Sequence, residues 1–186
     1  MLIVITLTGT IAGTMTVVFS RLAGQSAEAL RARERQALVQ ALLAEVRAMP
    51  FTYCDPQDAR AALATGAFAG GSGCAGPPDA FGPEAGESRY AAANRFDGVS
   101  DYHGFTMPGP GCASFCDRNG TALAGAARFA GCSLAVATTP LALPGLAALD
   151  ANGRPQALRI VVAMRCPGQG DTVAEGVRVR HAPNSF

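Results

Sequence analysis

The sequence predicts an α+β fold in which one long N-terminal helix packs against a small antiparallel β-sheet, with a long, disulfide-tethered loop region between them. Three observations predict it: an apolar N-terminal run that continues as an amphipathic segment, a middle rich in glycine and proline, and alternating strand patterns near the C-terminus. Of the 186 residues, about fifty fall in the helix, which leaves enough chain for one modest globular head.

Residues 1–20 contain no charged side chain, and the run from Leu2 to Phe19 is apolar apart from threonines and two glycines. As a helix this run would extend about 27 Å, close to the thickness of a bilayer's hydrocarbon core. We therefore expect residues 1–20 to form the transmembrane and filament-core half of the helix. A cleaved secretory signal is less favoured, because nothing basic precedes Leu2 and Arg21 interrupts the cleavage region. A buried core helix would normally show a polar face.

Small residues within this run are spaced so that a second helix can approach closely. Gly9 and Gly13 are four residues apart and are flanked by Ala12 and Thr16. Such spacing allows close backbone contact, which drives helix association where the hydrophobic effect is absent. We predict that these four residues form a helix-packing surface. The alternative is a weakly packed, lipid-facing helix, because the spacing is common in membrane segments.

Residues 21–49 are predicted to continue the same helix in amphipathic form. Charged residues such as Glu45 and Arg47 fall outside an apolar stripe. No glycine or proline lies between Gly24 and Pro50, and Pro50 is expected to end the helix. The predicted stripe consists of Leu30, Leu38, Leu42, Val46 and Met49.

The head is predicted to span residues 50–186, with a loop region over 50–111 and an antiparallel sheet region over 112–186. Glycine and proline crowd the stretch between Gly70 and Pro78, which leaves little room for regular structure there. Turn sequences ending in Asn-Gly occur at 117–120 and 150–153. Three strands are expected from apolar alternation, over residues 129–138, 158–166 and 172–181.

Six cysteines follow the helix, which indicates an oxidising compartment and up to three disulfides. Six cysteines allow fifteen pairings, and the sequence does not choose among them. A zinc site is disfavoured, because no histidine or second close cysteine pair completes a ligand set around Cys112 and Cys116. The arrangement we expect joins Cys54 to Cys74, Cys112 to Cys116 and Cys132 to Cys166.

Composition and motifs argue against several classes of function. The net charge of +1, with arginines scattered among acidic residues, disfavours a nucleic-acid partner. The sequence contains no nucleophile elbow, P-loop, zinc-protease motif or dinucleotide fingerprint, so we expect neither catalysis nor a cofactor. His103 and His181 stand alone. Asp97 and Asp101 could bind a cation or act as an acid-base pair, but turn and capping roles are favoured, and no metal site is expected.

Three segments together give the chain a resemblance to type IV pilins and pseudopilins. They are residues 1–5 (MLIVI) with Gly9 and Ala12, residues 42–51 (LLAEVRAMPF) and residues 95–105 (RFDGVSDYHGF). The last two resemble, more narrowly, the D-type minor pilins of the mannose-sensitive haemagglutinin pilus. The resemblance implies a helix laid against a small sheet, and a structural role without catalysis.

The resemblance also implies partners and a location. A minor pilin waits in the bacterial inner membrane with its head in the periplasm, and is then packed through its N-terminal helix against other pilin subunits in an extracellular filament. A pseudopilin of a type II secretion system is an alternative. A membrane-tethered periplasmic binding module or enzyme, using the loop from Asp97 to His103, is a further one.

The resemblance implies that one part of the pilin pattern would precede Met1. The resemblance places Met1 just after the glutamate of the pilin motif, so a basic leader and its peptidase site would precede it. Arginines such as Arg21 follow the apolar run and nothing basic precedes it, which by the positive-inside rule would put the head in the cytoplasm, where the cysteines would stay reduced. A basic leader removes this conflict. We therefore expect Met1 to be internal to a longer precursor, or to result from trimming.

Overall fold

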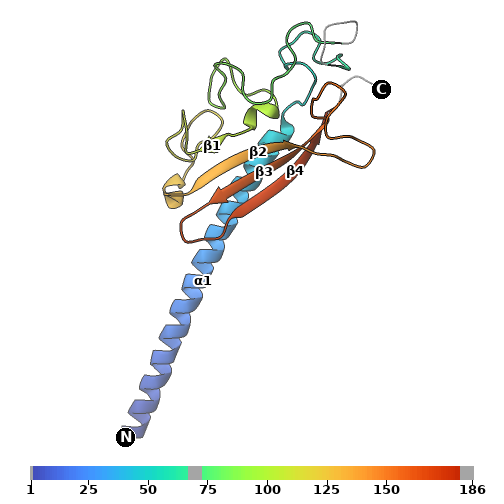
Figure 1. The fold of residues 1–186 in the computed structure, drawn as a ribbon. Helices are drawn as coiled ribbons and strands as arrows, with labels where there is room; N and C mark the ends of the chain where they lie inside the picture. Colours follow the sequence, from blue (N-terminus) through green and yellow to red (C-terminus); the bar gives the residue numbers. More distant parts are fainter. Residues whose placement is uncertain (1, 67–72, 181–186) are drawn as a thin grey trace. The chain divides into compact units, whose positions relative to one another are not determined.

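The computed structural model describes residues 2–66 and 73–180, with side chains from residue 13 onward. Within that part the chain forms one α-helix and one four-stranded antiparallel sheet, which is the predicted α+β class (Figure 1). The chain divides into two compact units, Met1–Leu38 and Val39–Phe186.

Helix α1 runs from Leu2 to Ala48 without interruption, as the sequence predicts. It ends just before Pro50, which restricts the residue before it and has no N–H to donate. The backbone N–H of Met49 donates to the carbonyl of Val46 at 3.1 Å and closes the last turn.

Among the described residues, no helix combines the length and the apolar character needed to cross a bilayer. The side chains of residues 1–12 lie outside the described part of the chain. The membrane location of residues 1–20 stays a prediction.

The last turns of α1, within the second unit, carry an apolar stripe that packs into the core. The stripe follows helical spacing at i, i+3, i+4 and i+7. The buried stripe differs from the predicted one. Leu30 is exposed, and Leu38 and Met49 are only half-buried. The buried members are Val39, Leu42, Leu43 and Val46.

The sheet has the order β1-β2-β3-β4, with all neighbours antiparallel. Three strands overlap the predicted segments, although β2 begins at Ser133 and not at residue 129, which ends a 3₁₀ helix. The fourth, β1, lies in the region predicted as loop. Strand β1 lies before residue 112, where the sequence analysis places the start of the sheet region, and a strand of two residues is too short to show an alternating pattern. The strands are β1 Thr106–Met107, β2 Ser133–Pro140, β3 Ala157–Arg165 and β4 Thr172–Val179.

Strand β3 buries every second side chain as predicted: Leu158, Ile160, Val162 and Met164 face the core. Strand β4 exposes two of its valines instead of burying them. The register pairs Ile160 with Gly176, so the even-numbered residues of β4 share the core face while Val177 and Val179 are exposed.

Gly176 has a packing reason to lack a side chain. A Cβ there would lie 2.8 Å from the Cδ of Arg47 and 3.2 Å from a methyl of Leu43. The glycine therefore lets the end of α1 lie close against β4 (Figure 1).

Three disulfides join Cys54 to Cys74, Cys112 to Cys116 and Cys132 to Cys166, the same pairs that the sequence analysis names. The first two tether the irregular part of the head, whereas the third joins the start of β2 to the end of β3. The irregular part also contributes large side chains to the core. Phe51, Phe96 and Tyr102 are buried there. Tyr102 belongs to a short 3₁₀ helix, η1, over Ser100–Tyr102, and this helix contacts β2.

Both predicted Asn-Gly turns are present. Asp117 and Asp150 each accept two backbone N–H groups at Oδ1, from residues two and four positions later. Gly120 and Gly153 close these turns with φ of +79° and +75°, a region that glycine adopts without strain.

Candidate functional site

The predicted helix-packing residues are only partly within the described side chains. Gly9 and Ala12 lie in the backbone of α1 but outside that part. Gly13 and Thr16 are exposed, and a Cβ added at Gly13 would meet no atom of the chain within 4 Å. Nothing in the described chain therefore explains why residue 13 should lack a side chain.

The helix around Gly13 exposes large apolar side chains on more than one side. Met15 and Val17 lie about 160° apart around the helix axis. Exposed fractions reach 65% at Phe19. The exposed apolar residues of this segment are Met15, Val17, Val18, Phe19 and Leu22.

The second feature is a group of carboxylates in the head, which we call the acidic cluster. Carboxylate oxygens of Asp79, Glu84 and Asp101 lie within 4.8 Å of one another, and so do those of Glu87, Asp97 and Asp101. Asp101 belongs to both sets and is 1% exposed, and Asp79 is also buried. Four carboxylates thus converge around that of Asp101, which makes a cluster of five.

Asp101 shapes the turn that carries it, as the sequence analysis expects for this loop. Its Oδ2 accepts the backbone N–H groups of Asp97 at 3.0 Å and Gly98 at 2.6 Å. Its other oxygen, Oδ1, is buried and has no hydrogen-bond partner in the described chain.

The other carboxylates are held by uncharged donors. The Ser100 hydroxyl donates to Asp79 at 2.9 Å, and the Gln57 amide donates to Asp97 at 3.0 Å. The backbone N–H of Glu84 donates to Glu87 at 3.0 Å. These bonds fix the side chains in place without neutralising them.

Burial first, and then repulsion from neighbouring carboxylates, raise the pKa values of Asp79, Glu87, Asp97 and Asp101. Burial is the main cause at Asp79, whose pKa rises to about 7, and at Asp101, whose pKa rises to about 6. At Asp101 the charges of Glu84 and Asp97 add to the rise, and the two backbone hydrogen bonds oppose it. Burial, with the neighbouring Glu84, also raises the pKa of Glu87.

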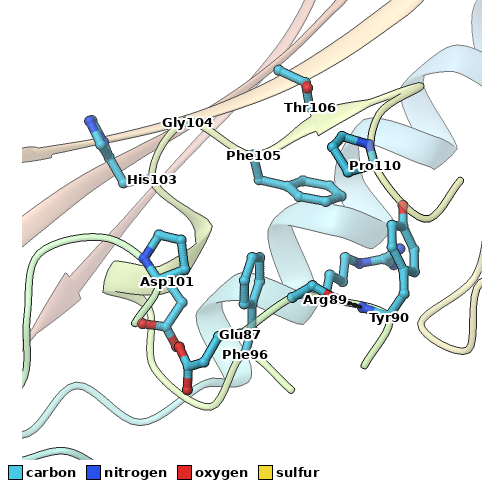
Figure 2. Close-up of a pocket in the computed structure, with 12 residues that line it drawn as sticks. Glu87, Arg89, Tyr90, Phe96, Asp101, His103, Gly104, Phe105, Thr106 and Pro110 are labelled. Carbon is cyan, nitrogen blue, oxygen red and sulfur yellow. Dashed lines mark hydrogen bonds between the residues drawn. The ribbon is translucent and has the colours of Figure 1, made fainter. Parts of the chain in front are cut away.

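A cavity of about 220 Å³ opens beside the cluster. Figure 2 shows the carboxylates of Asp101 and Glu87 pointing toward one another at one end of the cavity, with Arg89 and Tyr90 at the other end. Phe96 and Phe105 lie between these two ends (Figure 2). Of the five clustered carboxylates, those of Glu87 and Asp101 line this cavity.

Arg89 is committed to a separate network that ties α1 to the head. It donates to Glu45 through Nε at 2.8 Å and Nη2 at 2.7 Å, and through Nη1 to the carbonyls of Cys116 and Asp117 at 3.1 Å. The Tyr102 hydroxyl donates to the same Glu45 carboxylate at 2.7 Å. Burial raises the pKa of Glu45, but these hydrogen bonds outweigh it and hold the pKa below its usual value.

His103 is held at the sheet. Its Nδ1 lies 3.3 Å from the backbone nitrogen of Thr138, and its ring contacts that of Phe81 in a tilted arrangement, with 4.8 Å between the ring centroids. His181 lies outside the described residues. The arrangement suits cation binding better than acid-base catalysis, because the site supplies several hard oxygen ligands.

Sequence reasoning singled out Asp97 and Asp101 but missed their partners. The chain has 14 acidic residues, and Asp79, Glu84 and Glu87 lie close before this pair in the sequence, so local acidic density was the available signal. It was missed because the spacing follows no regular pattern.

Glu45 was placed on the polar face of the helix, and nothing in its helical position indicates the Arg89 partner 44 residues away.

Comparisons with family models, with curated proteins and with solved structures gave no match to this chain.

Proposed function

We propose that the chain is a minor pilin-like subunit of a type IV pilus, a structural protein whose N-terminal helix packs among the helices of other pilin subunits. The observation that carries the proposal is the exposed apolar surface of α1 around Gly13, from Met15 to Leu22. A helix that is apolar on several sides is normally covered by protein or lipid.

The sequence around Gly13 favours protein, and not lipid, as the partner that covers the exposed apolar surface of α1 in the assembled filament. Gly13 leaves space that the chain itself does not fill. Small residues at such positions let two helices approach closely, and the packing gained replaces contacts with lipid tails. The occupant we propose is therefore the corresponding helix of other subunits, reached after a stage in the inner membrane.

The head supports the same proposal in its chemistry. Three disulfides and a large irregular segment are typical of small domains that work outside the cytoplasm. The packing of the end of α1 on an antiparallel sheet is the layout that the pilin resemblance implies. A pseudopilin of a type II secretion system would share these features, and the location of the filament separates the two.

A size series at position 13 tests the proposal. Alanine and leucine both favour helix over glycine by up to about 1 kcal/mol, so neither variant should break α1. We expect Gly13→Ala to enter sheared surface filaments as the wild type does, and Gly13→Leu to be depleted from them while its head stays folded and oxidised. Equal incorporation of both variants would contradict close packing at this site, and absence of the wild type from filaments and from their assembly complexes would refute the proposal.

The second candidate function is a membrane-tethered binding module, and the cavity beside Asp101 and His103 favours it. The carboxylates of the acidic cluster that line this cavity are the groups that would contact a ligand. The two candidates are compatible, since a filament subunit can present a binding site on its head.

A further inference from the structure

We propose that the head binds one divalent cation of the calcium type through Asp101, Glu87 and Asp97 in the acidic cluster. The inference goes beyond the structural role in a filament and does not depend on it. It rests on two observations: the convergence of these carboxylate oxygens within 4.8 Å of one another, and the buried Oδ1 of Asp101, which has no hydrogen-bond partner in the described chain.

The spacing of the oxygens fits a single ion. Calcium binds protein oxygens at about 2.3–2.6 Å, so two ligands of one ion lie at most about 4.6–5.2 Å apart. The mutual distances in the set formed by Glu87, Asp97 and Asp101 fall within that limit.

The negative charge of the clustered carboxylates favours a bound counterion. A carboxylate that is 1% exposed is costly to keep ionised unless it is paired or binds a metal. At Asp101 the two backbone N–H groups satisfy Oδ2 only, and its other neighbours are further carboxylates. A cation satisfies Oδ1 and cancels the repulsion among Glu87, Asp97 and Asp101 in one step.

The ligand chemistry selects the class of ion. All candidate ligands are carboxylate oxygens, which suit calcium and magnesium and disfavour zinc or copper. Magnesium requires a near-ideal octahedron, whereas calcium accepts irregular arrangements of six to eight oxygens. Carboxylates from an irregular loop and a 3₁₀ helix, with room for water in the adjoining cavity, match calcium better.

Two sets share Asp101, and the structure favours the one facing the cavity. Glu87 and Asp101 both line the cavity, which gives the ion a path of entry. In the other set Asp79 lies near the positive charge of Arg180, which opposes a cation there.

Calorimetry and thermal unfolding of the full chain test the proposal, with the disulfides intact, in detergent micelles and after removal of metal with EDTA. Titration with CaCl₂ should show one site with a Kd of about 0.1–1 mM, and the melting temperature should rise with the logarithm of calcium concentration. NaCl at equal ionic strength should not reproduce the rise, although it screens repulsion. MgCl₂ should bind at least about tenfold more weakly.

Variants locate the ion. Asp101→Asn keeps an acceptor for the two backbone N–H groups and should weaken calcium binding at least about tenfold. Glu87→Gln should do the same, and because Glu87 is only half-buried it decides the matter if Asp101→Asn fails to fold. Asp171→Asn, on an exposed ion pair with Arg165, is the matched control and should bind as the wild type does.

The proposal is overturned if calcium gives no heat and no thermal shift, or if NaCl gives the same shift. It is equally overturned if Asp101→Asn and Glu87→Gln both bind calcium like the wild type. Loss of binding in Asp79→Asn combined with unchanged binding in Glu87→Gln would overturn the assignment of the ligands.

Discussion

Replacing Glu45 with glutamine probes the contact that joins the end of α1 to the loops of the head. In the wild type the side chains of Arg89 and Glu45 are 5% and 20% exposed, and their two hydrogen bonds form a bidentate pair. Glutamine has nearly the same shape but no charge. The variant therefore leaves the Arg89 guanidinium buried without a counterion.

The expected cost follows from this burial. Removing one partner of a buried ion pair costs about 3–5 kcal/mol. Glutamine retains an acceptor for the Tyr102 hydroxyl, so we expect the lower end, about 3 kcal/mol. For a chain of this size the loss lowers the melting temperature by about 6–12 °C.

The chain offers a matched control on its surface. Arg159 and Glu175 form the same two-bond arrangement, at 3.0 and 2.6 Å, but both side chains are 49% exposed. Glu175→Gln should leave the free energy of unfolding almost unchanged, because solvent screens an exposed ion pair. The assay is denaturant unfolding of both variants with intact disulfides. Equally small losses for Glu45→Gln and Glu175→Gln would refute the reasoning from burial.

Three further predictions concern the stability of the head. Because folding lowers the pKa of Glu45, this carboxylate stabilises the folded state above its unfolded pKa near 4.5, and the stabilisation is lost as the pH falls below that value. The difference in stability between the wild type and Glu45→Gln should therefore shrink on acidification from pH 6 to about pH 3. A constant difference would contradict the lowered pKa. Removing the disulfide Cys132–Cys166, whose cysteines are 34 residues apart, should lower the free energy of unfolding by about 4 kcal/mol, against about 2 kcal/mol for Cys112–Cys116, whose cysteines are 4 apart. Urea unfolding of variants with both cysteines of a pair replaced by serine measures the two losses. A larger loss for Cys112–Cys116 would count against loop entropy as the cause. Gly176→Val should destabilise the head by about 1–3 kcal/mol, because the valine side chain meets Leu43 and Arg47. The control Gly170→Ala should leave the stability almost unchanged, because an added Cβ there meets nothing within 4 Å. A Gly176→Val variant as stable as the wild type would show that the end of α1 does not lie close against β4.

The class of fold and most element positions could be predicted because they depend on local periodicity. The alternation of Leu158 to Met164 defines both β3 and its buried face, and the lack of glycine or proline after Gly24 indicates an uninterrupted helix up to Pro50. The alternation in β4 did not identify its buried face, because the face of an outer strand is set by its register with β3. That register is a tertiary property, and it places Gly176 inward and Val177 outward.

The candidate sites in the head could be predicted only in part. Asp97 and Asp101 are four residues apart, and the turn they form is local. Their convergence with Asp79, and the pairing of Glu45 with Arg89, depend on how an irregular loop folds back over tens of residues. No periodicity reports such long-range contacts, and only the density of acidic residues before residue 101 pointed to the cluster.

Site-specific photo-crosslinking from Phe19 tests the central claim most directly. This side chain is 65% exposed in the chain by itself, on the surface proposed to meet other subunits. A photoreactive phenylalanine analogue at position 19, in the cells that produce the protein, should give adducts with the N-terminal helix of another pilin-like subunit, recovered in the sheared filament fraction. Filaments that contain the chain without any such adduct, or a chain found only outside filaments, would contradict the account.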